Sequence, residues 1–211
     1  MIKNIILDFG HGGIDKNGQY TTAPSKMHQF SNGEVAYEGE LNRQIGGMLA
    51  LYLNTQRLRY NIVMTVNPYD PTDISLDKRV ETANKYKKDE SILISIHSNA
   101  TSPSGRGRGF EIFTTRGLTN SDQLATEIGV VIRDFYKKQN LELRFDFEDN
   151  DLDKEANFQI LKQSKCPAVL LECLFFDNWE DFKKLKDPEF QKELSWHIYK
   201  GIMNYLAKYG E

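Results

Sequence analysis

Short apolar runs alternate with amphipathic helical stretches along the whole chain, and this alternation constrains the fold more than any other feature. A short apolar run bounded by turn residues is typical of a buried strand, whereas apolar residues at helical spacing indicate a helix. Strands that alternate with helices indicate an α/β fold with a parallel sheet. The sequence therefore predicts a twisted, mainly parallel β-sheet with helices on both faces.

The predicted elements occupy most of the chain. Apolar runs predict the strands Ile2–Asp8, Tyr60–Val66, Ser91–His97, Phe110–Thr114 and Ala168–Cys173. Helical spacing predicts the helices Glu38–Gln56, Leu76–Lys88, Asn120–Lys138, Asp177–Lys186 and Glu189–Tyr209. Loops are expected over residues 14–37, Gly105–Gly109 and Arg144–Lys154. Because no repeat, low-complexity tract or Pro/Gly/Ser linker interrupts this order, residues 1–211 are predicted to form a single domain.

Charge and composition exclude several classes of partner. The formal net charge of −3 at pH 7 argues against a nucleic-acid-binding protein. No apolar run is long enough to span a bilayer, and the N-terminus carries no recognisable export signal. Cys166 and Cys173 are expected to stay unpaired, because their odd separation points them to opposite faces of one strand. We expect a monomer.

Polar side chains stand at the carboxyl ends of several predicted strands. Asp8 and His11 come at and after the first, His97 ends the central one, and Glu172 lies near the end of the last. The carboxyl ends of parallel strands meet at one edge of a sheet, where α/β proteins bind their ligands. We therefore expect these four side chains to lie close together.

The first helix is expected to add a carboxylate to this group. Its apolar stripe reaches Glu38 when it is extended backwards at helical spacing through Leu41, Ile45, Met48 and Tyr52. A carboxylate on a buried stripe is costly unless it is paired or binds a cation. Glu40 lies about 200° around the helix from Glu38 at roughly 100° per residue, so it is expected to face solvent.

His11, Glu38 and His97 form a donor set typical of a catalytic zinc site, in which three protein ligands leave a fourth position for water. Zinc lowers the pKa of a bound water molecule to roughly 7. A second carboxylate then serves as general base and acid. Glu172 is the candidate for this role, because its apolar strand is expected to raise its pKa.

Each of these residues also has a plainer interpretation. Taken by itself, His11 is interpreted as a histidine in a loop, and His97 as a histidine packed in the core. Glu172, taken by itself, is interpreted as the buried partner of a cation such as Arg79. Only their convergence on one predicted edge favours a metal site. Three further residues are candidates for substrate binding: Arg79, Asn99 and Asn178. The alternative for Arg79 is a structural ion pair, and the alternative for the two asparagines is capping of a turn.

The chain carries ordered motifs at these predicted positions. They are Ile5-Ile6-Leu7-Asp8-Phe9-Gly10-His11-Gly12-Gly13, Glu38-Gly39-Glu40-Leu41-Asn42, Ser95-Ile96-His97-Ser98-Asn99-Ala100, and Pro167-Ala168-Val169-Leu170-Leu171-Glu172 followed by Phe176-Asp177-Asn178. Together they resemble the motifs of the amidase_3 family of N-acetylmuramoyl-L-alanine amidases, in the family's order and over nearly the whole chain. The family usually has proline where Phe9 stands, and the segment between His11 and Glu38 is longer than in many members.

The resemblance implies a phosphorylase/hydrolase-like fold and a zinc enzyme that cleaves the amide between N-acetylmuramic acid and L-alanine in bacterial peptidoglycan. It implies that His11, Glu38 and His97 bind Zn²⁺ and that Glu172 is the catalytic glutamate. It also implies action at the bacterial cell wall, with no separate cell-wall-binding domain recognisable in the chain. The missing export signal fits either a holin-released phage endolysin or a host autolysin whose signal has been removed.

Two alternatives remain open from the residues alone. A zinc peptidase or a deacylase acting on another cell-wall amide would use the same donor set, and product analysis distinguishes it from the amidase. A wall-binding module that has lost catalysis would keep the fold. The presence of all three ligands and of the glutamate argues against such a module.

Overall fold

The computed structural model describes residues 1–144, 146 and 151–211, and six strands within these ranges form a sheet in the order β4-β1-β5-β8-β6-β7. They are β1 (Asn4–Phe9), β4 (Asn61–Met64), β5 (Ser91–Asn99), β6 (Glu111–Thr114), β7 (Lys154–Glu155) and β8 (Ala168–Phe175). β4, β1, β5 and β8 are parallel, whereas β6 runs antiparallel to β8. The predicted mainly parallel sheet is confirmed.

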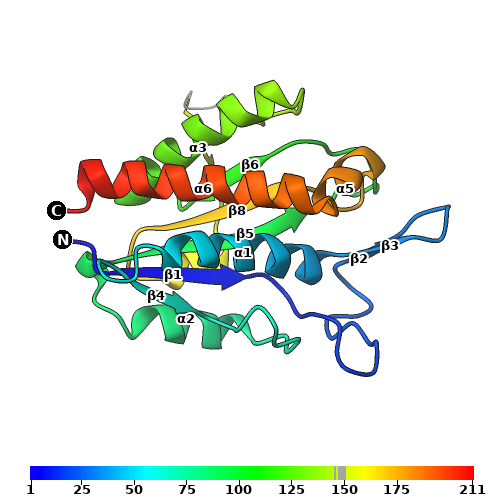
Figure 1. The fold of residues 1–211 in the computed structure, drawn as a ribbon, viewed down its shortest axis with the longest axis horizontal. Coiled ribbons are helices and arrows are strands. Elements are labelled where there is room, and N and C mark those ends of the chain that lie inside the picture. The colour runs from blue at the N-terminus through cyan, green and yellow to red at the C-terminus, as the bar shows by residue number, and fades with distance from the viewer. Residues whose placement is uncertain (145, 147–150) are drawn as a thin grey trace.

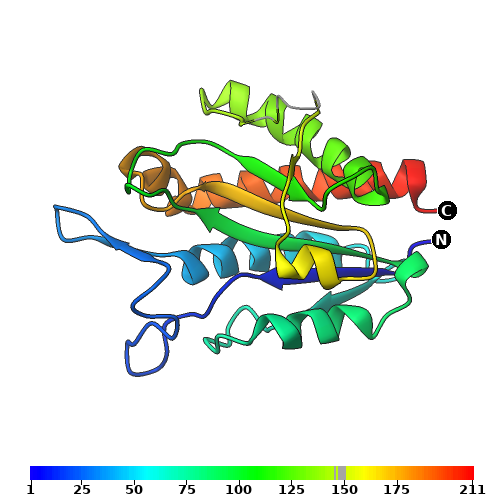
Figure 2. The same cartoon turned by 180° about the vertical axis from the view of Figure 1, so that it is seen from behind.

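Helices cover both faces of this sheet (Figures 1 and 2). One face carries α1 (Glu38–Asn54), α3 (Asn120–Lys138) and α6 (Pro188–Tyr209), and α6 packs against the other two. The opposite face carries α2 (Leu76–Asn84) and α4 (Gln159–Gln163), which pack against each other. α5 (Trp179–Leu185) follows the carboxyl end of β8. The predicted two-sided covering is confirmed.

Helix α1 docks closely on the first strand. Phe9 packs against Gly46, where a Cβ atom would lie 2.2 Å from the Phe9 ring, so only glycine allows this approach. Met48 and Tyr52 were expected on the buried stripe but are only half-buried. The buried leucine and isoleucine residues of this helix are spaced four apart, so the stripe passes beside these two positions. Its fully buried members are Leu41, Ile45, Leu49 and Leu53.

Several sequence-based elements differ from the structure. Residues 14–37, predicted as a loop, contain an antiparallel hairpin of β2 (Met27–Gln29) and β3 (Val35–Tyr37). The helix expected to reach Lys88 ends at Asn84, and a 3-10 turn spans Lys88–Glu90. In the predicted loop Arg144–Lys154, residues 145 and 147–150 lie outside the described residues, and its last residue begins β7. These strands are too short for a period of two to stand out.

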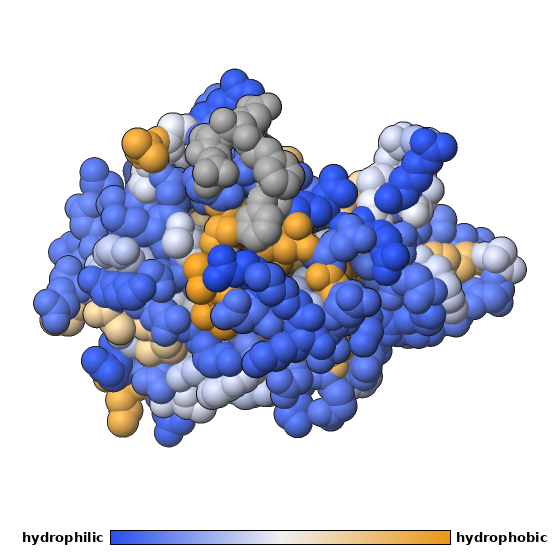
Figure 3. Space-filling model, turned by 90° about the horizontal axis from the view of Figure 1, so that it is seen from above, coloured by the Kyte–Doolittle hydropathy of each residue, from blue (hydrophilic) through white to orange (hydrophobic). Residues whose placement is uncertain are grey.

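Figure 3 shows a face made mostly of hydrophilic residues, with some hydrophobic residues gathered near its centre. In the described ranges, no helix combines the length and the apolar character that crossing a membrane requires. Cys166 and Cys173 are buried and free, as predicted.

Candidate metal centre

Three of the predicted residues meet beyond the carboxyl ends of β1 and β5. Glu38 Oε1 lies 3.0 Å from His97 Nδ1 and 3.2 Å from His11 Nε2. The Glu38 side chain is buried, whereas those of His11 and His97 are 20% and 15% exposed. Their donor atoms lie within 4.8 Å of one another, so they could hold a metal ion. Apart from this contact with Glu38, His11 Nε2 has no hydrogen-bond partner among the described residues.

Backbone geometry brings the two histidines together. A Cβ atom at position 10 would lie 2.2 Å from the His97 ring, so Gly10 leaves room for that ring. His11 has a φ of 65°, a left-handed conformation that costs a non-glycine residue about 1–3 kcal/mol unless its surroundings hold it. Its carbonyl accepts hydrogen bonds from Arg43 Nη1 at 2.7 Å and Arg79 Nη2 at 3.2 Å. Two guanidinium groups therefore hold this turn.

The start of α1 places Glu38 in the cluster. Asn42, one helical turn later, donates its side-chain amide to Glu38 Oε1 at 3.4 Å. Lys26 reaches over the site from the segment before β2, with its Nζ 3.7 Å from Glu38 Oε2. Burial raises the pKa of Glu38, but hydrogen bonds and charges from His11 and His97 outweigh it and hold that pKa well below its usual range. Glu38 is therefore a carboxylate.

Glu40 stays outside the cluster. Its Oε1 accepts a hydrogen bond from the Ile14 amide at 2.6 Å, so it ties the turn after β1 to α1. Its position two residues after Glu38 turns it away from the histidines, as helical phase predicted.

Glu172 lies beside the cluster with one carboxyl oxygen unpaired among the described residues. It is the register partner of His97 across β5 and β8. Its Oε2 is buried and has no hydrogen-bond partner among the described residues. Burial raises the pKa of Glu172 to about 8, although the neighbouring His97 opposes this. The interpretation of Glu172 as the partner of Arg79 is wrong, because Arg79 pairs with Asp8.

Asp8 is neutralised beneath the site. Arg79 Nη1 donates to Asp8 Oδ1 at 2.8 Å, and both side chains are almost fully buried. Thr65 and Ser95 donate their hydroxyl groups to the same carboxylate at 2.6 and 2.7 Å. Burial raises the pKa of Asp8, but Arg79 and these hydroxyl groups outweigh it and lower that pKa. The geometry therefore favours the structural ion pair over substrate binding for Arg79.

Glu111 belongs to the site but was not predicted. Its Oε1 accepts hydrogen bonds from Arg144 Nε at 2.7 Å and from Lys154 Nζ at 2.5 Å. Its Oε2 accepts one from Asn99 Nδ2 at 2.5 Å. Because Glu111 is the register partner of Glu172, Asn99, a candidate for substrate binding, lies near Glu172, but its side-chain amide already donates to Glu111. The signal in the sequence is a glutamate within an otherwise apolar strand.

Asn178 is a helix cap at the other rim of the site. Its Oδ1 accepts hydrogen bonds from the backbone amides of Glu180 and Asp181 at the start of α5. Its Nδ2 donates to the Gly105 carbonyl at 2.9 Å, which joins the Gly105–Gly109 loop to this helix. This is the turn-cap role that the sequence left as an alternative.

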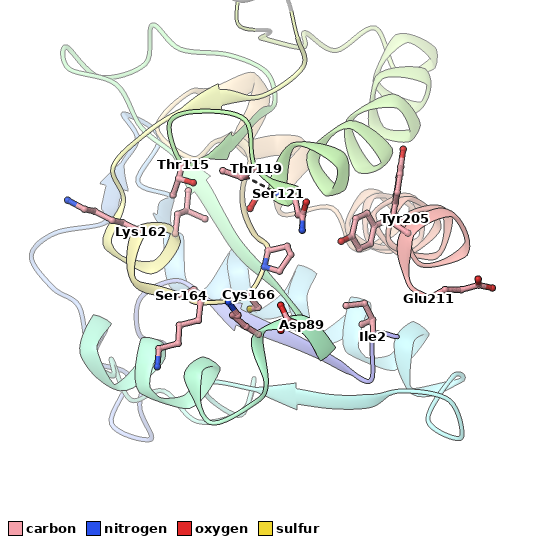
Figure 4. A pocket seen from close by; sticks show the side chains of 16 residues that line it. Ile2, Asp89, Thr115, Thr119, Ser121, Lys162, Ser164, Cys166, Tyr205 and Glu211 are labelled. Carbon is pink, nitrogen blue, oxygen red and sulfur yellow. Dashed lines mark hydrogen bonds between the residues drawn. The ribbon is translucent and has the colours of Figure 1, made fainter.

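The cavities agree with a site at the carboxyl edge. One cavity of about 360 Å³ opens beside His11 and His97 and extends to Asp73 and Arg79. Another, of about 510 Å³, lies at the amino ends of the strands (Figure 4). It includes Cys166 but no member of the histidine–glutamate cluster.

Fold and site together define an α/β protein with a metal-type ligand cluster and an unpaired carboxyl group at the carboxyl edge of its sheet. Residues 5–204 match the family model Amidase_3, described as N-acetylmuramoyl-L-alanine amidase. The chain belongs to this family.

Its relatives include cell-wall amidases of several bacteria. The chain is 31% identical over 208 residues to an uncharacterized cell wall amidase of Bacillus anthracis, covering 96% of this chain and 35% of that protein. It is 29% identical to the N-acetylmuramoyl-L-alanine amidase CwlM of Bacillus licheniformis, covering 99% and 68%. The crystal structure of an N-acetylmuramoyl-L-alanine amidase from Clostridium difficile 630 matches with a TM-score of 0.78 at 29% identity, covering 99% of both chains. The chain thus spans about a third of the length of the first relative.

Proposed function

We propose that this chain is a zinc-dependent amidase that hydrolyses the bond between N-acetylmuramic acid and L-alanine in peptidoglycan, acting at the bacterial cell wall. One observation carries the proposal: the half-buried Glu172, whose buried Oε2 has no hydrogen-bond partner among the described residues, lies beside His11, Glu38 and His97 in a chain of the amidase family. Hydrolysis of an amide requires a group that accepts a proton from water and returns it to the leaving amine, and a carboxyl group placed here can do both.

His11, Glu38 and His97 are the proposed zinc ligands. Bonds of roughly 2.0–2.2 Å in a tetrahedron place ligand atoms about 3.3–3.6 Å apart. The separations of 3.0 and 3.2 Å around Glu38 Oε1 are close to this spacing. Imidazole nitrogens and a carboxylate oxygen are donors that Zn²⁺ accepts in catalytic sites. Besides the contact with Glu38 Oε1, His11 Nε2 has no hydrogen-bond partner among the described residues, which leaves it available to a cation at this point.

Zinc, when bound, supplies a Lewis acid and lowers the pKa of water. Glu172 accepts the proton of the attacking water and delivers it to the nitrogen of the departing L-alanine. A carboxyl group whose pKa is raised by burial suits this double task near neutral pH. Arg79 pairs with Asp8, and Arg144 donates its Nε to Glu111, so both cations make their described hydrogen bonds with carboxylates other than Glu172.

The variant Glu172→Gln tests the proposed role. It keeps the size of the side chain and removes the group that titrates. We expect a folded protein that binds zinc but hydrolyses purified murein roughly 10²–10⁴ times more slowly. Undiminished turnover by the folded, zinc-loaded variant would show that Glu172 has no part in the reaction.

Product analysis tests the bond that is cut. Mass spectrometry of digested murein is expected to show stem peptides that begin with a free L-alanine amine. Free sugar amines would indicate a deacylase instead, and cleavage within the stem would indicate a peptidase.

A further inference from the structure

Arg144 lies next to the proposed proton carrier, on the side away from His97. Glu111 and Glu172 are register partners on the antiparallel strands β6 and β8. Directly opposed Cβ atoms in such a pair are about 4.5–5.5 Å apart. Arg144 Nε donates to Glu111 Oε1 at 2.7 Å. The guanidinium group of Arg144 therefore lies no farther from Glu172 than about the length of two residues of extended chain.

The guanidinium group of Arg144 is held from two directions. Its Nε is bonded to Glu111, which is itself buried. Its Cζ lies 5.4 Å from the centre of the Phe175 ring, in a cation–π contact. The two Nη atoms make no hydrogen bond within the described ranges, and the side chain is 42% exposed. A fixed, planar pair of donors therefore faces solvent beside Glu172.

Lys154 adds a second positive charge at the same place. Its Nζ donates to the same Glu111 oxygen as Arg144, so one carboxylate is shared by two cations. Asn99 occupies the other oxygen of Glu111 and is neutral. The group therefore carries one positive charge in excess, and the free donors of Arg144 match the two oxygens of a carboxylate.

We propose that Arg144, supported by Lys154, binds a carboxylate of the stem peptide and selects substrates that carry it. This inference rests on the proposed function. Glu172 returns its proton to the L-alanine amine, so the peptide lies on the Glu172 side of the site. The residue after L-alanine then reaches Arg144. In stem peptides that residue is a glutamyl group whose α-carboxyl is either free or amidated, and Arg144 favours the free form.

The test uses two soluble muramyl tripeptides that differ only in an α-carboxylate or an α-carboxamide on the second residue. The wild-type protein is expected to show the lower KM for the carboxylate. Arg144→Lys keeps a cation for Glu111 but removes the planar pair of donors. We expect it to raise KM about fivefold for the carboxylate substrate, with kcat little changed and the amide substrate unaffected.

Arg59→Lys is the matched control. The Arg59 guanidinium group also packs on an aromatic ring, that of Tyr60, but it lies next to the amino end of β4. This variant is expected to leave both KM values unchanged.

Two results would overturn the inference. An equal change of KM or kcat on both substrates in Arg144→Lys would show that Arg144 only supports Glu111. Equal KM values of the wild-type protein for both substrates would show that no carboxylate is selected. If the wild-type protein released no L-alanine amine from either tripeptide, the proposed function itself would fail, and this inference with it.

Discussion

Replacing Glu172 by glutamine is expected to stabilise the metal-free protein near neutral pH. The side chain is half-buried, and its Oε2 is buried without a hydrogen-bond partner among the described residues. Burial raises its pKa to about 8 from an ordinary value of 4.5. Glutamine has nearly the same size and never carries a charge, so the variant avoids the cost of a buried, unpaired carboxylate.

The size and sign of the effect follow from proton linkage. Below pH 4.5 the carboxyl is protonated in both folded and unfolded chains, so variant and wild type differ little. As pH rises, the unfolded chain loses the proton first, and the wild-type fold loses about 1.4 kcal/mol of stability per pH unit. The loss ends near the folded pKa of about 8. The variant is therefore at most about 5 kcal/mol more stable than wild type above that pH.

Urea unfolding followed by circular dichroism, at pH 5, 6, 7 and 8 with a chelator present, measures this difference. The chelator matters because a bound cation would lower the pKa of Glu172. Asp8→Asn is the control of opposite sign. The pKa of Asp8 is lowered by Arg79 and the hydroxyl groups, although burial opposes them. Its stabilising charge is present above pH 3.8 and lost as pH falls through the folded pKa. A Glu172→Gln gain that stayed constant from pH 5 to 8 would refute the reasoning.

Three further predictions follow from other contacts. Arg79→Met leaves Asp8 buried without its cation and is expected to cost about 3–5 kcal/mol in urea unfolding; unchanged stability with a raised KM would indicate substrate contact instead. Glu38→Gln is expected to weaken zinc binding at least about tenfold, measured by competition with a chromogenic chelator. Removal of the metal from the wild-type protein by a chelator should abolish murein hydrolysis until Zn²⁺ is restored. Tyr136→Phe removes a buried hydrogen bond of 2.6 Å to the Cys173 carbonyl and should lower the free energy of unfolding by about 1 kcal/mol in urea unfolding. An unchanged free energy of unfolding would contradict this prediction.

Local patterns in the sequence were sufficient for the sheet and for the convergence of the cluster. Apolar runs marked the buried strands, and parallel strands share a carboxyl edge, so His11 and His97 were expected to meet. Helical phase placed Glu38 with them and Glu40 away from them. The strands and the position of Glu38 on its helix follow from the spacing of apolar residues within one short segment. That spacing is the same before and after the chain folds.

The tertiary structure alone decided which charges are paired. Arg79 pairs with Asp8 rather than with Glu172, whereas Glu111 pairs with Arg144 and Lys154 from a distant segment. No period within one helix or strand carries this information, because the partners come from different elements. A buried carboxylate needs a counter-ion, but the packing of the whole chain determines which cation can reach it. In the part of the chain that the structure describes, no cation forms an ion pair with Glu172 for that reason.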